Sequence, residues 1–177
     1  MTDYPVVLLI EQELTAQDAQ QVRGLHDEIE EQVVYHVLLP VEDAAIRVES
    51  AMGALGTGEM MPSGLLVDES DIQEMQADLL ADARNALANT IAAIEAVGGQ
   101  AHGDLLATDP VEGLTAKVSK VDAREAIILT RPHVVSEFFH LDWSSRARRK
   151  LGVPVLHLLE HENFDEQSGQ GEGVTGL

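Results

Sequence analysis

Continuous apolar runs alternate along the chain with segments of helical periodicity. Each run is short and rich in Val, Ile or Leu, which is typical of strands buried on both faces of a parallel sheet. The runs cover residues 5–10, 33–39, 101–108, 126–129 and 153–159. Between them, apolar residues recur at three- and four-residue steps, which predicts helices starting near residues 15, 68, 109 and 134. Five strands alternating with four helices predict an α/β protein with a doubly wound sheet.

Two of the predicted helices have well-defined buried stripes. The first helix starts at Thr15, and its stripe comprises Val22, Leu25, Ile29 and Val33. The second spans 68–97, and its stripe comprises Ile72, Met75, Leu79, Ala83, Leu87, Ile91 and Ile94. Capping signals mark the helix starts: Thr15 with Asp18, Ser70 with Gln73, and Asp109 with Pro110 and Glu112. The predicted helix stops are Gly98–Gly99 and Gly152.

The pattern weakens between residues 42 and 66. Glycines and a proline in this stretch predict a mobile loop at the sheet edge, with a short helix over 44–55 as a further reading. Residues 163–177 contain four glycines and scattered acids, so we expect a disordered acidic, glycine-rich tail. Residues 1–162 are therefore predicted to form a single domain.

Composition narrows the class of protein. The chain has 31 acidic and 11 basic residues, a net charge of −20, which disfavours nucleic acid and anionic membranes as partners. It contains no cysteine, so disulfides and thiolate chemistry are excluded. The first residues lack the basic region of a signal peptide, and no apolar run approaches the roughly 18 residues of a membrane span. We therefore expect a cytoplasmic protein.

Three segments resemble the universal stress protein family. Residues 108–114 (TDPVEGL) are similar to the family's turn into its third helix, 123–130 (AREAIILT) to its fourth strand, and 151–158 (LGVPVLHL) to its closing strand. Element order agrees from about residue 6 to residue 160. The resemblance implies a three-layer fold with a five-stranded parallel sheet of order 3-2-1-4-5 and helices on both faces. It also implies a homodimer paired through the last strand.

The sequence departs from the family where nucleotide-binding members carry Gly-x2-Gly-x9-Gly-Ser/Thr. The corresponding stretch begins Thr130-Arg131-Pro132-His133, and no glycine lies between Gly113 and Gly152. Proline has no backbone N–H, so a backbone phosphate cradle of the usual kind is not expected. We therefore predict no cofactor, and no ATP binding in the usual way.

Ligands of open α/β sheets bind at the carboxyl ends of the strands, where the strand order reverses. The predicted crevice lies between the first and fourth strands, and its ligand-binding residues are Glu11, Thr130, Arg131 and His133. Arg131 is suited to a phosphate or carboxylate, and His133 titrates near neutrality. The alternative is structural: Arg131 pairs with a nearby acid such as Glu11 and shapes the turn.

The last strand is apolar and lies at the edge of the expected sheet, so it invites pairing with a second chain. The predicted dimer-interface residues are Val153, Val155, His157 and Leu159. The basic run over 146–150 complements the dipole of the last helix, and an acidic partner is the alternative. His157 and His161 lack a third ligand, so no metal site is predicted.

Nucleophile-elbow, Walker and dinucleotide motifs are all missing, and no catalytic residue is predicted. The first functional hypothesis is a universal stress protein-like cytoplasmic regulatory or adaptor protein without catalysis. The alternative is a ligand-binding or enzymatic member of the nucleotide-binding α/β class, with Arg131 and His133 as a non-glycine anion site. A third possibility is an assembly partner that uses the last strand and the face around Trp143.

Overall fold

The computed structural model describes residues 3–41, 69–130 and 150–159. Three predicted features lie outside the described residues: the loop over 42–66, nearly all of the helix over 134–151, and the tail over 163–177. The crevice residues Arg131 and His133 and the helix residue Trp143 also fall outside them.

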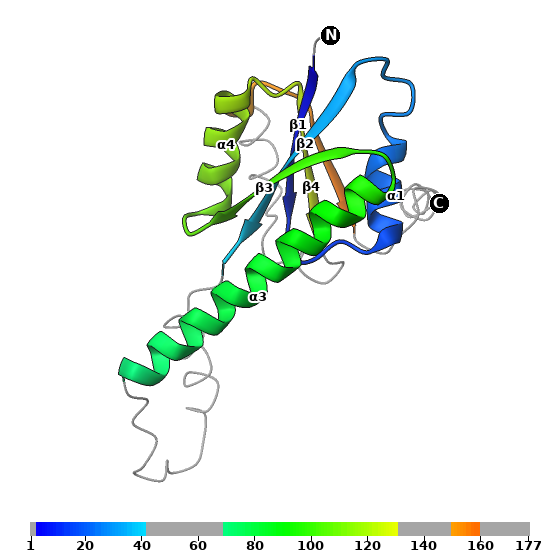
Figure 1. Ribbon diagram of the computed structural model, residues 1–177. Helices are drawn as coiled ribbons and strands as arrows, with labels where there is room; N and C mark the ends of the chain where they lie inside the picture. Colours follow the sequence, from blue (N-terminus) through cyan, green and yellow to red (C-terminus); the bar gives the residue numbers. More distant parts are fainter. Residues whose placement is uncertain (1–2, 42–68, 131–149, 160–177) are drawn as a thin grey trace, which may run out of the picture.

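Five parallel strands form one sheet in the order β3-β2-β1-β4-β5 (Figure 1). The strands are β1 (Asp3–Ile10), β2 (Gln32–Pro40), β3 (Gln100–Leu106), β4 (Glu125–Thr130) and β5 (Val155–Leu159). Every neighbouring pair is parallel, so the predicted fold class and strand order are confirmed. The first strand starts two residues earlier than predicted, and β5 starts two residues later, which leaves Val153 outside the strand.

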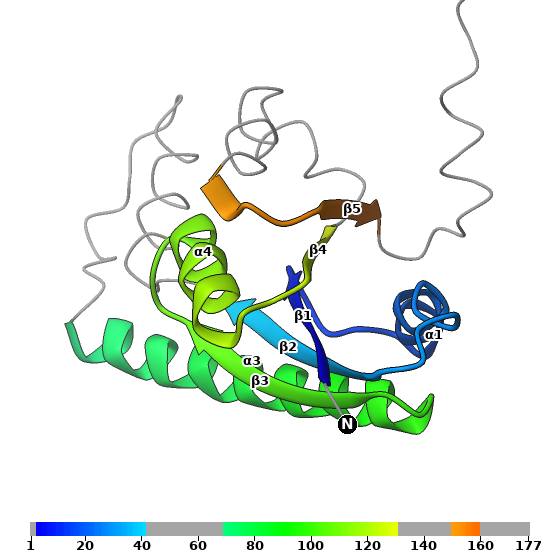
Figure 2. The ribbon, with the colours of Figure 1, turned by 90° about the horizontal axis from the view of Figure 1, so that it is seen from above.

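Helices cover both faces of the sheet, as predicted (Figure 2). They are α1 (Ala16–Gly24), α3 (Glu69–Ala96) and α4 (Pro110–Val121). Side chains of α1 and α3 share one apolar cluster with alternate residues of β1, including Val6 and Leu8. Val7 and Leu9 point to the other face and pack with α4. Because β1 is buried on both sides, its sequence is continuously apolar rather than alternating.

The first helix is shorter than predicted. It starts as expected, because the Thr15 hydroxyl accepts a hydrogen bond from the Asp18 N–H at 3.2 Å and the Asp18 carboxylate accepts one from the Thr15 N–H at 3.0 Å. However, α1 ends at Gly24, Leu25 lies in the turn that follows, and Ile29 lies in the segment after that turn. Both side chains still pack against the core, so the apolar pattern correctly predicted burial but not helical conformation.

The long helix α3 is buried over its second half only. Leu87, Thr90 and Ile94 are buried, whereas Met75 is 36% exposed. The 28 residues of α3 span about 42 Å, whereas a strand of eight residues spans about 27 Å. The first half of the helix therefore extends past the sheet (Figure 1), and the predicted stripe is not buried along its whole length. Ser70 lies inside the helix, so its predicted role as N-cap is wrong.

The predicted start of α4 and the predicted end of α3 are confirmed. The Asp109 carboxylate caps α4 by accepting hydrogen bonds from the backbone N–H groups of Val111 and Glu112 at 2.9 and 3.0 Å. Gly98 ends α3 with a φ of 82°. At the end of α4 the left-handed position is taken by Asp122, with a φ of 52°, although glycine is the usual residue there.

Candidate functional site

The predicted crevice lies at the carboxyl ends of β1 and β4. The two strands pair in register up to Ile10 and Leu129, so Glu11 and Thr130 follow side by side at this edge. The structure therefore brings together two of the four predicted ligand-binding residues. The other two, Arg131 and His133, lie outside the described residues, and their placement stays a prediction.

Thr130 makes a contact that the sequence did not reveal. Its hydroxyl oxygen lies 2.8 Å from Nε2 of His157, and the direction of this hydrogen bond depends on the imidazole tautomer. Burial lowers the pKa of His157, which favours the neutral ring. Thr130 is only 7% exposed, so its hydroxyl is a poor first contact for a ligand. Thr130, a predicted ligand-binding residue, and His157, a predicted interface residue, are thus hydrogen-bonded to each other within one chain.

The side chains of β5 are largely packed within the chain itself. Val153 and Val155 contact the cluster under α4, whereas Leu156 and Leu158 belong to the cluster under α1 and α3. The side chain of Leu159 lies outside the description. Any pairing at this edge must therefore rely on the backbone more than on the predicted interface side chains.

A cavity of about 490 Å³ lies at the opposite, amino-terminal edge of the sheet, on the α4 side. Its lining combines carboxylates, imidazoles, an amide, a guanidinium and apolar side chains. The lining residues are Asp3, Pro5, Val34, His36, Gln100, His102, Val121, Asp122 and Arg124. Sequence analysis missed this cavity because its residues come from three strands and from the end of α4, and only the strand register brings them together.

Two histidines are neighbours in this cavity. His36 of β2 and His102 of β3 are register partners, and their ring centroids lie 5.8 Å apart. Burial is the main cause that lowers the pKa of His36, and Lys117 and His102 lower it further. Lys117 is held by Asp104, with 2.5 Å between Nζ and the carboxylate oxygen. The His36 imidazole is therefore neutral near pH 7, and its Nδ1 atom is buried without a hydrogen-bond partner in the described part of the chain.

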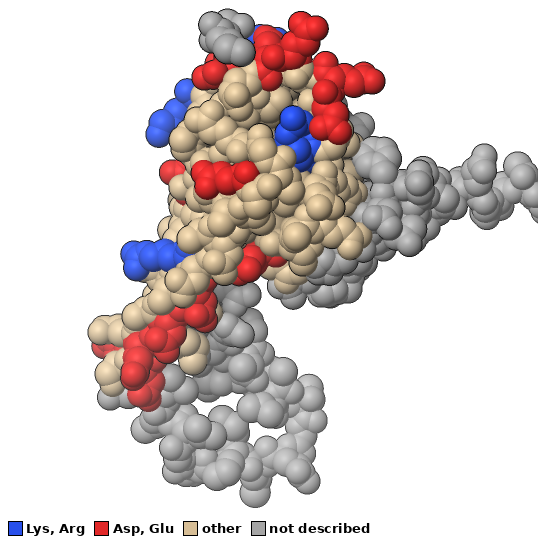
Figure 3. All heavy atoms as spheres, turned by 45° about the vertical axis from the view of Figure 1, so that its right-hand side comes forward, with Lys and Arg blue, Asp and Glu red and all other residues tan. Residues whose placement is uncertain are grey.

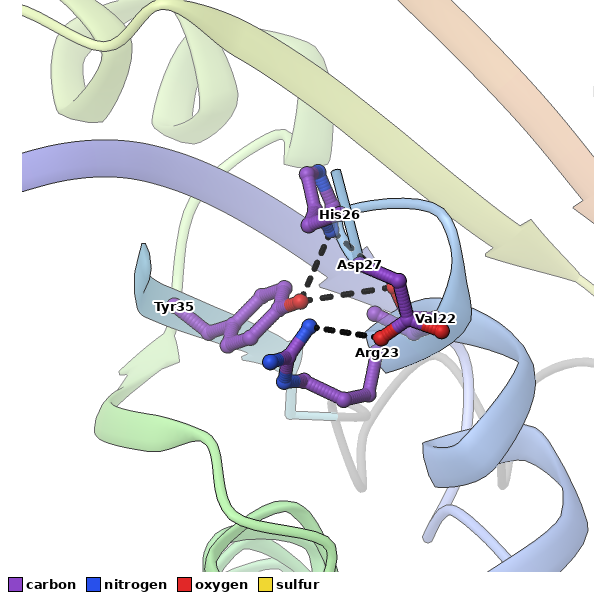
Figure 4. A network of polar contacts seen from close by, with 5 residues as sticks. All are labelled: Val22, Arg23, His26, Asp27 and Tyr35. Carbon is purple, nitrogen blue, oxygen red and sulfur yellow. Dashed lines mark hydrogen bonds and ion pairs between the residues drawn. The ribbon is translucent and has the colours of Figure 1, made fainter. Parts of the chain in front are cut away.

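A second buried polar cluster explains why α1 ends early (Figure 4). Nδ1 of His26 lies 2.8 Å from the Tyr35 hydroxyl and 3.1 Å from the Val22 carbonyl oxygen. Nε2 of the same ring pairs with the Glu125 carboxylate at the start of β4. These contacts hold the segment after α1 against β2 and β4. Burial also raises the pKa of Tyr35 above its usual value, so the phenol stays neutral. We assign this cluster a structural role because His26 is only 3% exposed and Tyr35 is fully buried.

The surface is strongly acidic in places. The extended half of α3 bears acidic side chains along its length (Figure 3), at Glu69, Asp71, Glu74, Asp78 and Asp82. Within residues 3–41, 69–130 and 150–159, no three His, Asp or Glu side chains are placed to hold a metal ion together. No helix in these ranges has both the length and the apolar character that a bilayer span requires.

No protein-family model and no curated protein sequence matches this chain. Solved structures are similar to it. Hypothetical protein MJ0577 is 14% identical with a TM-score of 0.60, over 90% of this chain and 98% of that one. A universal stress protein from Archaeoglobus fulgidus is 16% identical with a TM-score of 0.49, over 86% of this chain and 91% of that one. A universal stress protein family protein from Arabidopsis thaliana, solved with AMP bound, is 10% identical with a TM-score of 0.49, over 92% of this chain and 95% of that one.

At these identities the likeness concerns the fold alone. Together with the parallel sheet of order β3-β2-β1-β4-β5, it shows that the chain has a universal stress protein-like α/β fold. The fold expected from the sequence resemblance is thereby confirmed.

Proposed function

We propose that this chain is a cytoplasmic, universal stress protein-like regulatory or adaptor protein that acts as a homodimer and has no catalysis of its own. The observation that supports the dimer most directly is the position of β5 at the end of the sheet. In the part of the chain that the structure describes, no strand pairs with the outer side of β5. An apolar edge strand without a partner is a template for pairing with a second chain.

The backbone of β5 indicates which groups take part. The Ala126 N–H donates a hydrogen bond to the Pro154 carbonyl oxygen at 2.9 Å. Alternate residues of a parallel strand direct their backbone groups to the same side, so Pro154 and Leu156 face β4. Val155 and His157 then direct their N–H and C=O groups away from the sheet. These outward groups are the ones that a second copy of β5 pairs with in the proposed dimer.

Replacing Val155 by proline is expected to convert the dimer into a monomer. Proline removes an outward N–H and leaves the bonds to β4 intact, and it is tolerated on edge strands. Val155→Ala is the matched control, because it trims the same side chain, keeps the N–H and is expected to remain dimeric. Light scattering gives the mass, and circular dichroism checks that both variants fold. A wild-type monomer, or a Val155→Pro variant that stays dimeric, would contradict edge pairing.

The proposal also includes that the predicted crevice at the carboxyl ends of β1 and β4 does not bind adenine nucleotides. We expect ATP, ADP and AMP to leave the melting temperature of the purified protein unchanged. The support is the sequence after β4, which has Pro132 and no glycine where backbone N–H groups would approach phosphates. A thermal-shift titration with each nucleotide tests this expectation.

The alternative function is a ligand-binding or enzymatic protein with an anion site built on Arg131 and His133. Its support is the position of Glu11 directly after β1, at the end of the sheet where the strand order reverses. Stabilisation by a nucleotide or another phosphorylated metabolite, lost in Arg131→Ala, would put this alternative first. Absence of any shift across the panel supports the regulatory dimer.

A further inference from the structure

The cavity at the amino-terminal edge of the sheet is separate from the crevice and from β5. Its two imidazoles come from β2 and β3, and strands β1 and β4 lie between them and β5. Neither the predicted site nor the proposed dimer uses it. The ligand chemistry of this cavity is therefore a separate question.

The geometry of the histidine pair suits a shared ion. His36 and His102 lie directly opposite each other on adjacent strands, and both line the cavity. An ion bonded to one nitrogen of each ring at about 2.0–2.1 Å places the ring centroids about 5–6 Å apart. The observed separation of the centroids is 5.8 Å. The separation of the two ring centroids therefore lies within the range that a shared metal ion requires.

The electrostatics of the cavity also favour a cation. Asp3 and Asp122 line it, and the carboxyl end of α4, the negative end of the helix dipole, lies at its wall. Two cations lie close to the cavity, and each is paired with a carboxylate: Lys117 with Asp104, and the lining residue Arg124 with Glu31 at 3.2 Å. The net charge of −20 concentrates cations around the protein as a whole.

We propose that His36 and His102 together bind one first-row transition-metal dication, such as Zn²⁺ or Ni²⁺, with water completing the coordination. Imidazole is a preferred ligand of these ions, whereas Mg²⁺ prefers oxygen. The described residues offer no third side chain in position, so this is a two-ligand site with open positions. Open positions are characteristic of metal sites that exchange their ion or bind a further ligand, rather than of closed structural sites.

The test is isothermal titration calorimetry of the tag-free full chain with ZnCl₂, NiCl₂ and MgCl₂ at pH 7.5, in a buffer without chelators. We expect one Zn²⁺ or Ni²⁺ per chain and no binding of Mg²⁺. His102 is exposed, so His102→Gln is expected to fold normally and to weaken Zn²⁺ binding at least about tenfold. Gln100→Ala changes a lining residue without an imidazole and is expected to bind Zn²⁺ like the wild type.

Three results would overturn the proposal. They are no binding of Zn²⁺ or Ni²⁺, unchanged affinity in His102→Gln, and an equal loss of affinity in Gln100→Ala. The chain has seven histidines, so binding that persists in His102→Gln would place the ion elsewhere. Melting curves without metal confirm that both variants are folded. The cavity lies at the amino-terminal ends of β1, β2 and β3, whereas β5 is the outermost strand on the other side of the sheet. A negative result for metal binding therefore leaves the dimer proposal untouched.

Discussion

Replacing Glu125 by alanine is expected to lower the free energy of unfolding by about 2–3 kcal/mol. The Glu125 carboxylate is the partner of Nε2 on His26, whose side chain is only 3% exposed. Its removal leaves a buried ring nitrogen without a hydrogen-bond partner. The loss also releases the segment after α1 from the start of β4. Urea unfolding at pH 7, followed by circular dichroism, measures the effect.

Glu125→Gln is the matched control. The glutamine amide keeps an oxygen that accepts a hydrogen bond from the His26 N–H, so we expect less than half of the alanine effect. Tyr35→Phe removes the hydroxyl at the other nitrogen and is expected to lower the free energy of unfolding by about 1 kcal/mol. If alanine and glutamine are equally destabilising, the charge of the carboxylate matters more than the hydrogen bond. A loss below about 0.5 kcal/mol for alanine, the size usual for surface changes, would contradict a structural role for the cluster.

Replacing Gly103 by valine is expected to lower the free energy of unfolding by about 2 kcal/mol. Leu87 of α3 packs directly on Gly103 of β3, and an added Cβ would lie 2.7 Å from both Cγ and Cδ1 of this leucine. Leu87 is buried, so its side chain has little room to move away. The substitution therefore pushes α3 away from the sheet. Urea unfolding of the purified variant measures the loss.

A double variant separates crowding from other effects of valine. Leu87→Ala alone leaves a cavity and is expected to lower the free energy of unfolding by about 2–4 kcal/mol. In Gly103→Val with Leu87→Ala, the new side chain fills part of that cavity, so the two losses should not add. Purely additive losses would show that contact with Leu87 is not the reason for glycine at this position.

Local patterns correctly predicted the strands and helices in the described part of the chain. Apolar runs located all five strands, and the residues around Thr15 and Asp109 correctly marked the starts of α1 and α4. The strand order came from the family resemblance, because apolar runs alone do not specify which strands are neighbours. The predicted length of α1 was wrong because the spacing of Leu25 and Ile29 indicates only that they pack against the core. Residues outside a helix can pack against the core as well.

The sites were harder to predict, since they depend on contacts between distant residues. His26 and Glu125 are 99 positions apart, and nothing local indicates that they meet. His36 and His102 had a visible signal, because each interrupts or borders an apolar run predicted to be a strand. The signal becomes informative only when the register of β2 and β3 is known. Of the predicted crevice, the structure describes only Glu11 and Thr130, and the placement of Arg131 and His133 stays a prediction.

The left-handed residue at the end of α4 connects conformational strain with the chemistry of the cavity. Asp122 has a φ of 52°, a conformation that glycine adopts at lower energy than any residue with a Cβ. Asp122 also lines the cavity that contains the two imidazoles. A glycine at this position would relax the backbone and remove that negative charge. Asp122→Gly is therefore expected to raise the thermal stability and to weaken the proposed binding of a cation, so the two properties favour different residues at position 122.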